Sequence, residues 1–372
     1  MYLPKLNTYI DLCILYIGLF IPSIMSLGPG EQEVRKLQST GGSTFTLSLP
    51  KPWVTEHHLG SRDSLRVDWR PSGALRITPL TSSNEQERHA FFDHSNLPKN
   101  SLHDHLMGAY ISGADVIKIR FTSGRSKELA RSVRRFLKST RGFEIINESD
   151  DMMEMRCLLN ASEMPLSASL NRMYLLVTSL MRDIVNSFDG GELEFLEDSG
   201  ERESEVDALL YLIDRQVRIL LDSHAVAAKL NITRPMAVEY GNLARSLERM
   251  MDHVHNLSRF ILQNPEFISA SDDFPPMLHV STWMNALKEL MINIRTRDSI
   301  RIEHARHELK SMQQSLLEYE REELEKTSKG PLLAQKLSIS ESIRRLGAYS
   351  RDFGEILLNM KISTEMNVVQ NG

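Results

Sequence analysis

Two pairs of acidic residues in the C-terminal half have a spacing that suits metal binding. Asp207 follows Glu203 by four positions, and Asp252 follows Glu248 by four. Residues i and i+4 lie on one face of a helix, so each pair would point two carboxylates at one hard cation. Two such helices side by side would supply four oxygen donors. The spacing makes these four residues possible metal ligands.

The spacing alone is a weak indication of a site. With 49 acidic residues in 372 positions, about six acid–acid pairs arise at this spacing by chance. A second interpretation is a solvated helix face on which Arg202, Arg245 and Arg249 form ion pairs with the carboxylates. His253 and His255 flank the second pair and could assist a metal, but we expect them to lie at the surface on other faces.

Amphipathic helices would have to position these side chains. Apolar residues recur at steps of three and four over 170–184, 206–220, 243–261, 282–294, 305–319 and 339–360. This pattern predicts three helices within 164–264 and three more within 275–363, which together form a duplicated three-helix bundle. Asp189-Gly190-Gly191 and the segment 231–235 separate the helices of the first bundle.

The second bundle departs from the acidic pattern. Aligning 246–252 with 342–348 places Arg344 where the first bundle has Glu248, and Ala348 where it has Asp252. An arginine repels a cation and an alanine offers no ligand. We therefore expect a metal site on the first bundle and none on the second.

Residues 33–80 have the pattern of a small β module. Apolar and polar residues alternate over 44–49, 65–70 and 75–78, and we expect a first strand over 34–38 with a turn at Gly41-Gly42. A short helix is expected over 51–59, and Pro71-Ser72-Gly73 is expected to form the last turn. A module of this size cannot bury a stable core alone, so it should pair with a second copy.

The charge of this module differs from that of the whole chain. Between residues 33 and 80 there are seven Lys or Arg and four Asp or Glu, hence +3, whereas the chain has a formal net charge of −5. A surface that faces nucleic-acid phosphates needs such an excess, although an ordinary solvated β face is an alternative. Our candidate DNA contacts are Arg35, Lys36, Lys51 and Arg66.

Between the two regions the sequence predicts a connector and a small α/β segment. Residues 81–105 are polar and are interpreted as the connector. Strands are expected over 115–121, 143–146 and 152–158, with a helix over 126–140. One face of this helix is basic, with Lys127, Arg131, Arg134, Arg135 and Lys138. That face could contact DNA or a phosphate-bearing ligand, or it could be a solvated face balanced by the acidic C-terminal half.

Composition indicates a soluble globular protein in a reducing compartment. Hydrophobic residues make up 41% and charged residues 25%, and the two cysteines, Cys13 and Cys157, have no metal-ligand spacing. The chain has no GxGxxG, P-loop, GxSxG or HExxH motif, so we do not expect an enzyme. Residues 1–30 contain an apolar run over 12–24, shorter than the roughly 20 residues that a bilayer span needs. A signal peptide, a membrane anchor and a true start at Met25 are the interpretations of this leader.

Two resemblances extend this interpretation. The segments 34–54 (VRKLQSTGGSTFTLSLPKPWV) and 63–77 (DSLRVDWRPSGALRI) resemble the AbrB/MazE/SpoVT transcription factors. In that family two chains interlock their hairpins into a DNA-binding barrel. The segments 203–213 (ESEVDALLYLI) and 244–257 (ARSLERMMDHVHNL) resemble the PhoU family of phosphate-uptake regulators. Its members are tandem three-helix bundles whose ExxxD motifs hold metal, so the resemblance implies a divalent or iron-type ion on the first bundle.

The order of these parts is similar to that of the archaeal-type phosphate-uptake regulators. The resemblance implies an α+β protein with a leader (1–30), a swapped-hairpin DNA-binding domain (31–82), a connector and α/β segment (83–163), and two helical bundles (164–264 and 275–363). It implies a cytoplasmic, dimeric, non-enzymatic transcriptional regulator of phosphate uptake, anchored to a membrane if the leader is real. The alternative is an adaptor that does not bind DNA and acts on a phosphate transporter or a signalling partner.

Overall fold

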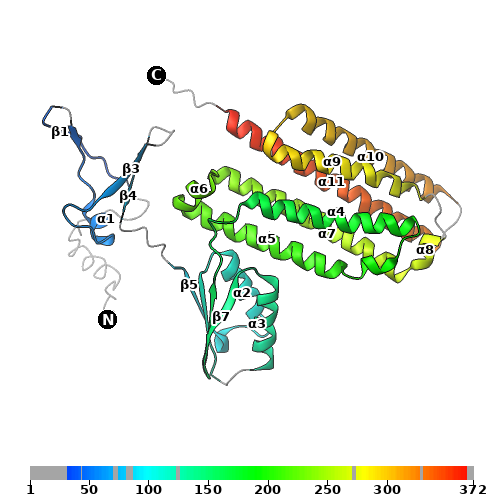
Figure 1. Cartoon of the computed structure of the whole chain (residues 1–372), viewed down its shortest axis with the longest axis horizontal. Helices are drawn as coiled ribbons and strands as arrows, with labels where there is room; N and C mark the ends of the chain where they lie inside the picture. Colours follow the sequence, from blue (N-terminus) through cyan, green and yellow to red (C-terminus); the bar gives the residue numbers. More distant parts are fainter. Residues whose placement is uncertain are drawn as a thin grey trace, which may run out of the picture. The chain divides into compact units, whose positions relative to one another are not determined.

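The computed structural model describes residues 32–42, 44–69, 74–80, 87–122, 126–269, 274–326 and 330–366. The chain divides into two compact units, Met1–Gln86 and Glu87–Gly372 (Figure 1). The leader over 1–30 and the turn expected at 71–73 lie outside the described residues. No helix in the described ranges combines the length and the apolar content that crossing a membrane requires.

The first unit has the predicted order of strand, strand, helix, strand, strand. Its elements are β1 (Gln38–Thr40), β2 (Thr44–Thr46), α1 (Lys51–Glu56), β3 (Leu65–Trp69) and β4 (Leu75–Pro79). Strands β1 and β2 pair antiparallel, as do β3 and β4. The first strand lies later than the predicted 34–38. The hairpin turn requires glycine, since Gly41 and Gly42 have φ angles of +68° and +85°.

This unit has almost no core of its own. Pro79 is the one described side chain that is fully buried in it. Large apolar side chains remain open to solvent, including Val34 at 98%, Phe45 at 69% and Val67 at 58% exposure. Exposed apolar surface on this scale is typical of a face that another chain covers. Pairing of two copies by swapped hairpins stays a prediction, because the structure contains one chain.

The second unit begins with a four-stranded sheet covered by two helices. Its elements are β5 (His89–Asp93), a 3₁₀ turn η2 (His94–Asn96), α2 (Leu102–Ile111), β6 (Val116–Arg120), α3 (Lys127–Ser139), β7 (Phe143–Glu148) and β8 (Met152–Cys157). The strand order is β5-β6-β8-β7, with β5 and β6 parallel and the other pairs antiparallel. Both helices lie on one face of the sheet (Figure 1), where they share a core with it.

The expectation of a loose connector over 81–105 was wrong. Residues 89–93 form strand β5, and α2 begins at Leu102. Leu102, Leu106 and Tyr110 are fully buried at helical spacing, but two of them lie near or beyond the expected boundary at 105. The expected boundary at residue 105 therefore cuts through an apolar helical stripe that continues to residue 110. The strands and the helix predicted after residue 115 are confirmed.

The rest of the second unit is helical. It comprises α4 (Leu166–Phe188), η3 (Leu193–Leu196), α5 (Ser199–Asp222), α6 (His224–Leu230), α7 (Arg234–Gln263), α8 (Pro265–Ser269), α9 (Pro275–Thr296), α10 (Ser299–Glu325) and α11 (Pro331–Glu365). The six predicted helices are all present, as α4, α5, α7, α9, α10 and α11. Helices α6 and α8 are short and were not predicted. They occupy the segments where the apolar stripes stop.

The two sets of three helices share one hydrophobic core. Buried residues from α4 to α11 form a single continuous cluster, and α7 packs directly against α11 (Figure 1). At this contact the Trp283 indole donates a hydrogen bond of 2.9 Å to Ser350 Oγ, which lies 3.6 Å from Met250 Sδ. The protein is therefore a mixed α+β structure whose C-terminal region is one packed helical body.

Candidate functional site

The four predicted metal ligands lie on two adjacent helices. Glu203 and Asp207 are on α5, and Glu248 and Asp252 are on α7, which packs along α5. We call these four residues the acidic cluster. Asp214 of α5 pairs with Arg245 of α7, and Asp207 interacts electrostatically with Asp252. Moving back along α5 from residue 214 to residue 207 corresponds to moving forward along α7 from residue 245 to residue 252. The two helices therefore run antiparallel, and the two acidic pairs face each other.

The carboxylates of the cluster are partly buried and repel one another. Burial, with the charges of Glu203 and Asp252, raises the pKa of Asp207 to about 6. Burial, with the charges of Asp252 and Asp207, raises the pKa of Glu248 to about 7. Burial also raises the pKa of Asp252, against the opposing effects of His253 and His255. Desolvation and like charge both disfavour the ionised form, so a cation placed here would relieve both.

The interpretation of these carboxylates as an ion-paired surface was wrong. Arg202 pairs with Asp183 at 2.5 Å and with Asp198 at 2.9 Å. Arg245 contacts both oxygens of Asp214 at 2.9 and 3.0 Å, and the guanidinium of Arg249 lies over the Tyr349 ring, 5.7 Å from its centroid. Within the described ranges, no ion pair reaches the acidic cluster. Arg245 and Arg249 act on Glu248 only at longer range, so the described residues leave the four carboxylates without a direct cationic partner.

The two neighbouring histidines are less exposed than expected. His253 is half-buried, and its ring centroid lies 5.7 Å from that of Tyr349. His255 is also half-buried, and its Nδ1 atom is enclosed without a hydrogen-bond partner. A Cβ atom on Gly200 would lie 3.8 Å from His255 Cε1, so this histidine faces the first turn of α5. His255 therefore places an imidazole nitrogen without a described hydrogen-bond partner next to α5.

The donor types suit a metal ion, but the side chains do not converge on one point. Within the described residues, no group of three or more His, Cys, Asp or Glu side chains is arranged so that it could hold an ion. The chemistry nevertheless fits a hard or borderline cation, because the cluster offers carboxylates without cationic partners and a histidine nitrogen without a hydrogen bond. Binding would require the carboxylates to draw together.

The second bundle neutralises the corresponding region internally. Arg344 on α11 donates to Glu320 Oε1 on α10 at 3.1 Å, and Ser340 Oγ contacts the same oxygen at 3.0 Å. The first bundle leaves its carboxylates unpaired, whereas the second supplies an arginine. This difference is consistent with the prediction of a metal site on the first bundle alone.

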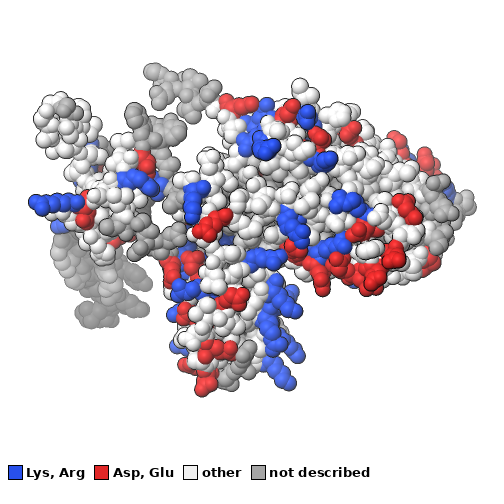
Figure 2. Space-filling model, viewed as in Figure 1, with Lys and Arg blue, Asp and Glu red and all other residues white. Residues whose placement is uncertain are grey.

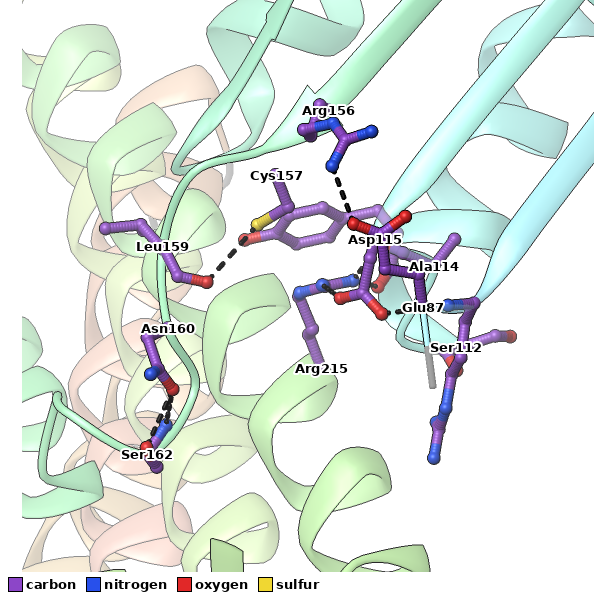
Figure 3. Close-up of polar contacts among 12 residues, drawn as sticks. Glu87, Ser112, Ala114, Asp115, Arg156, Cys157, Leu159, Asn160, Ser162 and Arg215 are labelled. Carbon is purple, nitrogen blue, oxygen red and sulfur yellow. Dashed lines mark hydrogen bonds and ion pairs between the residues drawn. The ribbon is translucent and has the colours of Figure 1, made fainter. Parts of the chain in front are cut away.

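Helix α5 also anchors the α/β segment, through a residue that sequence reasoning missed. The Arg215 side chain is 3% exposed. It donates to the carbonyl oxygens of Tyr110 and Ala114 at 3.0 and 2.7 Å and to Asp115 Oδ1 at 3.0 Å (Figure 3). Its guanidinium lies 5.3 Å from the centroid of the Tyr110 ring. The sequence does contain an indication of this anchoring role. Apolar residues on α5 extend beyond one stripe, which is typical of a helix buried on two sides.

Further contacts fix the same junction. Gln216 donates to the carbonyl oxygens of Ala161 and Met164 at 3.2 and 2.8 Å. Arg88 and Asp222 form an ion pair at 3.2 Å. Tyr211, on the turn after Asp207, packs against the core of the α/β segment. One helix therefore carries half of the acidic cluster near its start and the main attachment of the α/β segment near its end.

The four candidate DNA contacts are not equivalent. Arg35 pairs with Glu33 at 2.6 Å and donates to Ser48 Oγ at 3.0 Å and to two backbone carbonyls, so it holds the unit together. Arg66 lies 3.5 Å from Asp68. Lys36 and Lys51 are exposed and form no ion pair with any described residue. They are the two candidates that can contact a phosphate without breaking an internal bond.

The geometry so far is a bundle of α4, α5 and α7 with a partly buried acidic cluster on α5 and α7. Residues 170–261 match the PhoU domain. The matched range of the PhoU domain begins within α4, ends within α7 and contains all four residues of the acidic cluster. It does not extend to residues 31–82 or to the second bundle. A comparison of the chain with curated proteins found no match.

Proposed function

We propose that this protein regulates phosphate uptake or homeostasis, and that its helical region senses phosphate status or binds a regulatory partner. The observation that carries the proposal is that the matched PhoU domain contains the acidic cluster, whose carboxylates form no ion pair with a described residue. We propose no catalysed reaction, and we place the protein in the cytoplasm, where both DNA and a transporter's inner face are accessible.

The acidic cluster is the proposed site for a divalent or iron-type cation. Glu203, Asp207, Glu248 and Asp252 would supply the oxygen ligands, and His255 could add a nitrogen. Hard divalent ions prefer carboxylate oxygens. A bound cation would offset the burial and the repulsion that raise the pKa values of Asp207 and Glu248. It would also tie α5 to α7 at this point.

The first unit is the proposed DNA-binding part, acting as a pair of copies. Three features support this role: its charge of +3 within a chain of −5, the succession of two hairpins around a short helix, and the exposed apolar side chains that need a cover. Lys36 and Lys51 are the proposed phosphate contacts. The proposed partners are therefore DNA and a second copy of the chain.

Charge reversal at two exposed lysines tests this role. The double variant Lys36→Glu/Lys51→Glu should weaken binding to duplex DNA carrying the protein's own promoter by at least about tenfold at moderate salt, because it removes two phosphate contacts. The salt dependence of binding should fall as well. Fluorescence anisotropy measures the affinity, and light scattering checks that the dimer persists. Arg35 is left intact because its hydrogen bonds stabilise the unit.

The matched control reverses two lysines of the helical region. Lys288 and Lys310 are exposed and form no ion pair with any described residue, so Lys288→Glu/Lys310→Glu changes the net charge equally. If both double variants lose affinity to the same degree, the first unit is not the contact surface.

The alternative function is that of an adaptor that binds a phosphate transporter or a signalling protein and does not bind DNA. The observation in its favour is that two candidate DNA contacts, Arg35 and Arg66, are engaged with Glu33 and Asp68. In that case the first unit would serve only to pair two chains. If the protein binds no DNA duplex at any salt concentration while the dimer stays intact, the result supports this alternative.

A further inference from the structure

Helix α3 presents an uncompensated basic face on the α/β segment. Its members are the five exposed cations of this helix, Lys127, Arg131, Arg134, Arg135 and Lys138. We call them the α3 basic face. Figure 2 shows Lys and Arg side chains in a column along the side where α3 lies. None of the five forms an ion pair with a described residue.

The cations on the strands of the same segment are paired. On the strands, Lys118 lies 3.2 Å from Glu154, Arg120 lies 2.7 Å from Asp93, and Arg156 lies 2.6 Å from Glu87. The acidic residue of α3, Glu128, accepts a hydrogen bond of 2.9 Å from the Asn100 backbone and so stabilises the loop before α2. The segment thus balances its charges on the sheet and leaves them unbalanced on α3.

The acidic helical region does not balance this face either. Arg141, two residues after α3 ends, lies 3.8 Å from Glu205 of α5, but the five cations of the α3 basic face reach no such partner among the described residues. The α3 basic face is therefore solvated, as one interpretation of the sequence expected, and within the described residues no direct ion pair joins it to the acidic C-terminal half. Five cations at steps of three and four occupy about 17 Å of one helix face, where they repel one another.

We propose that the α3 basic face contacts the phosphate backbone of duplex DNA. About 17 Å of duplex carries about ten phosphates, which is enough to neutralise five cations on one side. Three of the five are arginines, whose planar guanidinium group can donate two hydrogen bonds to one phosphate. Such contacts fix position on the duplex and carry no sequence information. This inference relies on the proposed function only for the choice of DNA as the polyanion.

The side chains around this face argue against two other partners. The apolar residues of α3 point into the core, with Leu129, Val133 and Phe136 at 1% exposure or less. A helix that lies on a membrane needs exposed apolar residues to insert between lipids. A protein interface needs a core of aromatic or aliphatic side chains. The α3 basic face offers charge alone, which suits a polyanion bound through counterion release.

A matched pair of triple variants of the full-length chain tests this contact. Arg131→Gln/Arg134→Gln/Lys138→Gln removes three charges from the face. The control, Arg182→Gln/Arg259→Gln/Lys288→Gln, removes three exposed cations without ion pairs from separate helices. Affinity for a 40-base-pair duplex of unrelated sequence is measured against salt concentration. The α3 variant should lower the slope of log K against log salt by about 2 to 3, and the control should leave it unchanged. Circular dichroism confirms that both variants fold.

The outcomes separate this inference from the proposed role of the first unit. A lower salt slope for the α3 variant, together with wild-type DNA affinity for Lys36→Glu/Lys51→Glu, supports the α3 contact. The same result contradicts the first unit as the binding surface. If Lys36→Glu/Lys51→Glu loses DNA affinity while the α3 variant keeps the wild-type salt slope, the α3 contact is overturned and the proposed function stands. Equal slopes in the α3 variant and its control also overturn it. Binding of the chain to anionic vesicles but not to the duplex overturns it in favour of a membrane.

Discussion

Replacing Arg215 with methionine should lower the free energy of unfolding of this protein by about 2 to 4 kcal/mol. The substitution removes three hydrogen bonds that the guanidinium donates across the junction between α5 and the α/β segment. It leaves the Ala114 carbonyl oxygen without its donor and Asp115 without its cation in a site where the arginine is 3% exposed, whereas the Tyr110 carbonyl keeps the Gly113 backbone N–H. Urea unfolding followed by circular dichroism measures the loss.

The control for this prediction lies on the same helix. Arg218 is exposed and forms no ion pair with a described residue, so Arg218→Met should change the free energy of unfolding by less than about 0.5 kcal/mol. Arg215→Lys should be intermediate, because one ammonium group cannot reach all three acceptors in the geometry of a guanidinium fork. Equal losses for Arg215→Met and Arg218→Met would mean that the junction does not stabilise the fold.

In the presence of a chelator, the protein should be less stable at about pH 8 than at about pH 5. The pKa of Glu248 rises from 4.5 to about 7, and that of Asp207 rises from 3.8 to about 6. Between the ordinary and the raised values the folded state binds more protons than the unfolded state, so stability falls as the pH rises through this window. After allowance for solvent screening, the two groups should contribute about 1 to 2 kcal/mol.

The double variant Asp207→Asn/Glu248→Gln should remove most of this pH dependence and should be more stable than the wild type at about pH 8. The asparagine and glutamine side chains of this variant are neutral across the whole pH range, so they bind and release no proton. The remaining charges near Glu248, which are Asp252, Arg249 and Arg245, are unchanged. Asp214→Asn provides the matched control, since this carboxylate of the same helix lies outside the acidic cluster and pairs with Arg245. Its replacement should leave the pH dependence due to Asp207 and Glu248 in place. Thermal unfolding from pH 5 to 8 would contradict the account if the double variant and the wild type had parallel profiles.

The sequence was sufficient for features that depend on local periodicity. Stripes at steps of three and four located all six long helices, because each buries one face along its whole length. The i,i+4 spacing placed Glu203 with Asp207, and Glu248 with Asp252, on single helix faces. That these two faces meet depends on the antiparallel packing of α5 and α7, which the resemblance suggested and the spacing could not.

Features that depend on tertiary contacts were missed. The first turn of helix α2, up to residue 105, was assigned to a polar connector, and the rest of the helix was not predicted. Its buried residues Leu102, Leu106 and Tyr110 pack on the sheet, and a stripe this short gives little indication of a helix. Arg215 was not singled out, because its acceptors are about 100 positions away in the sequence. Arg35 was chosen for its charge, and the hydrogen bonds that engage it come from a segment 13 and 14 residues later. In each case the deciding partner is distant along the chain.

The central claim is that the acidic cluster binds a cation. The most direct measurement is the metal content of the purified full-length protein by elemental analysis, compared between the wild type, Glu248→Gln/Asp252→Asn and the control Asp214→Asn. Divalent or iron-type metal should be present in the wild type and in Asp214→Asn and should be absent from the double variant. Equal metal content in all three proteins, or none in the wild type after reconstitution with Mn²⁺, Mg²⁺ or Fe²⁺, would contradict the claim.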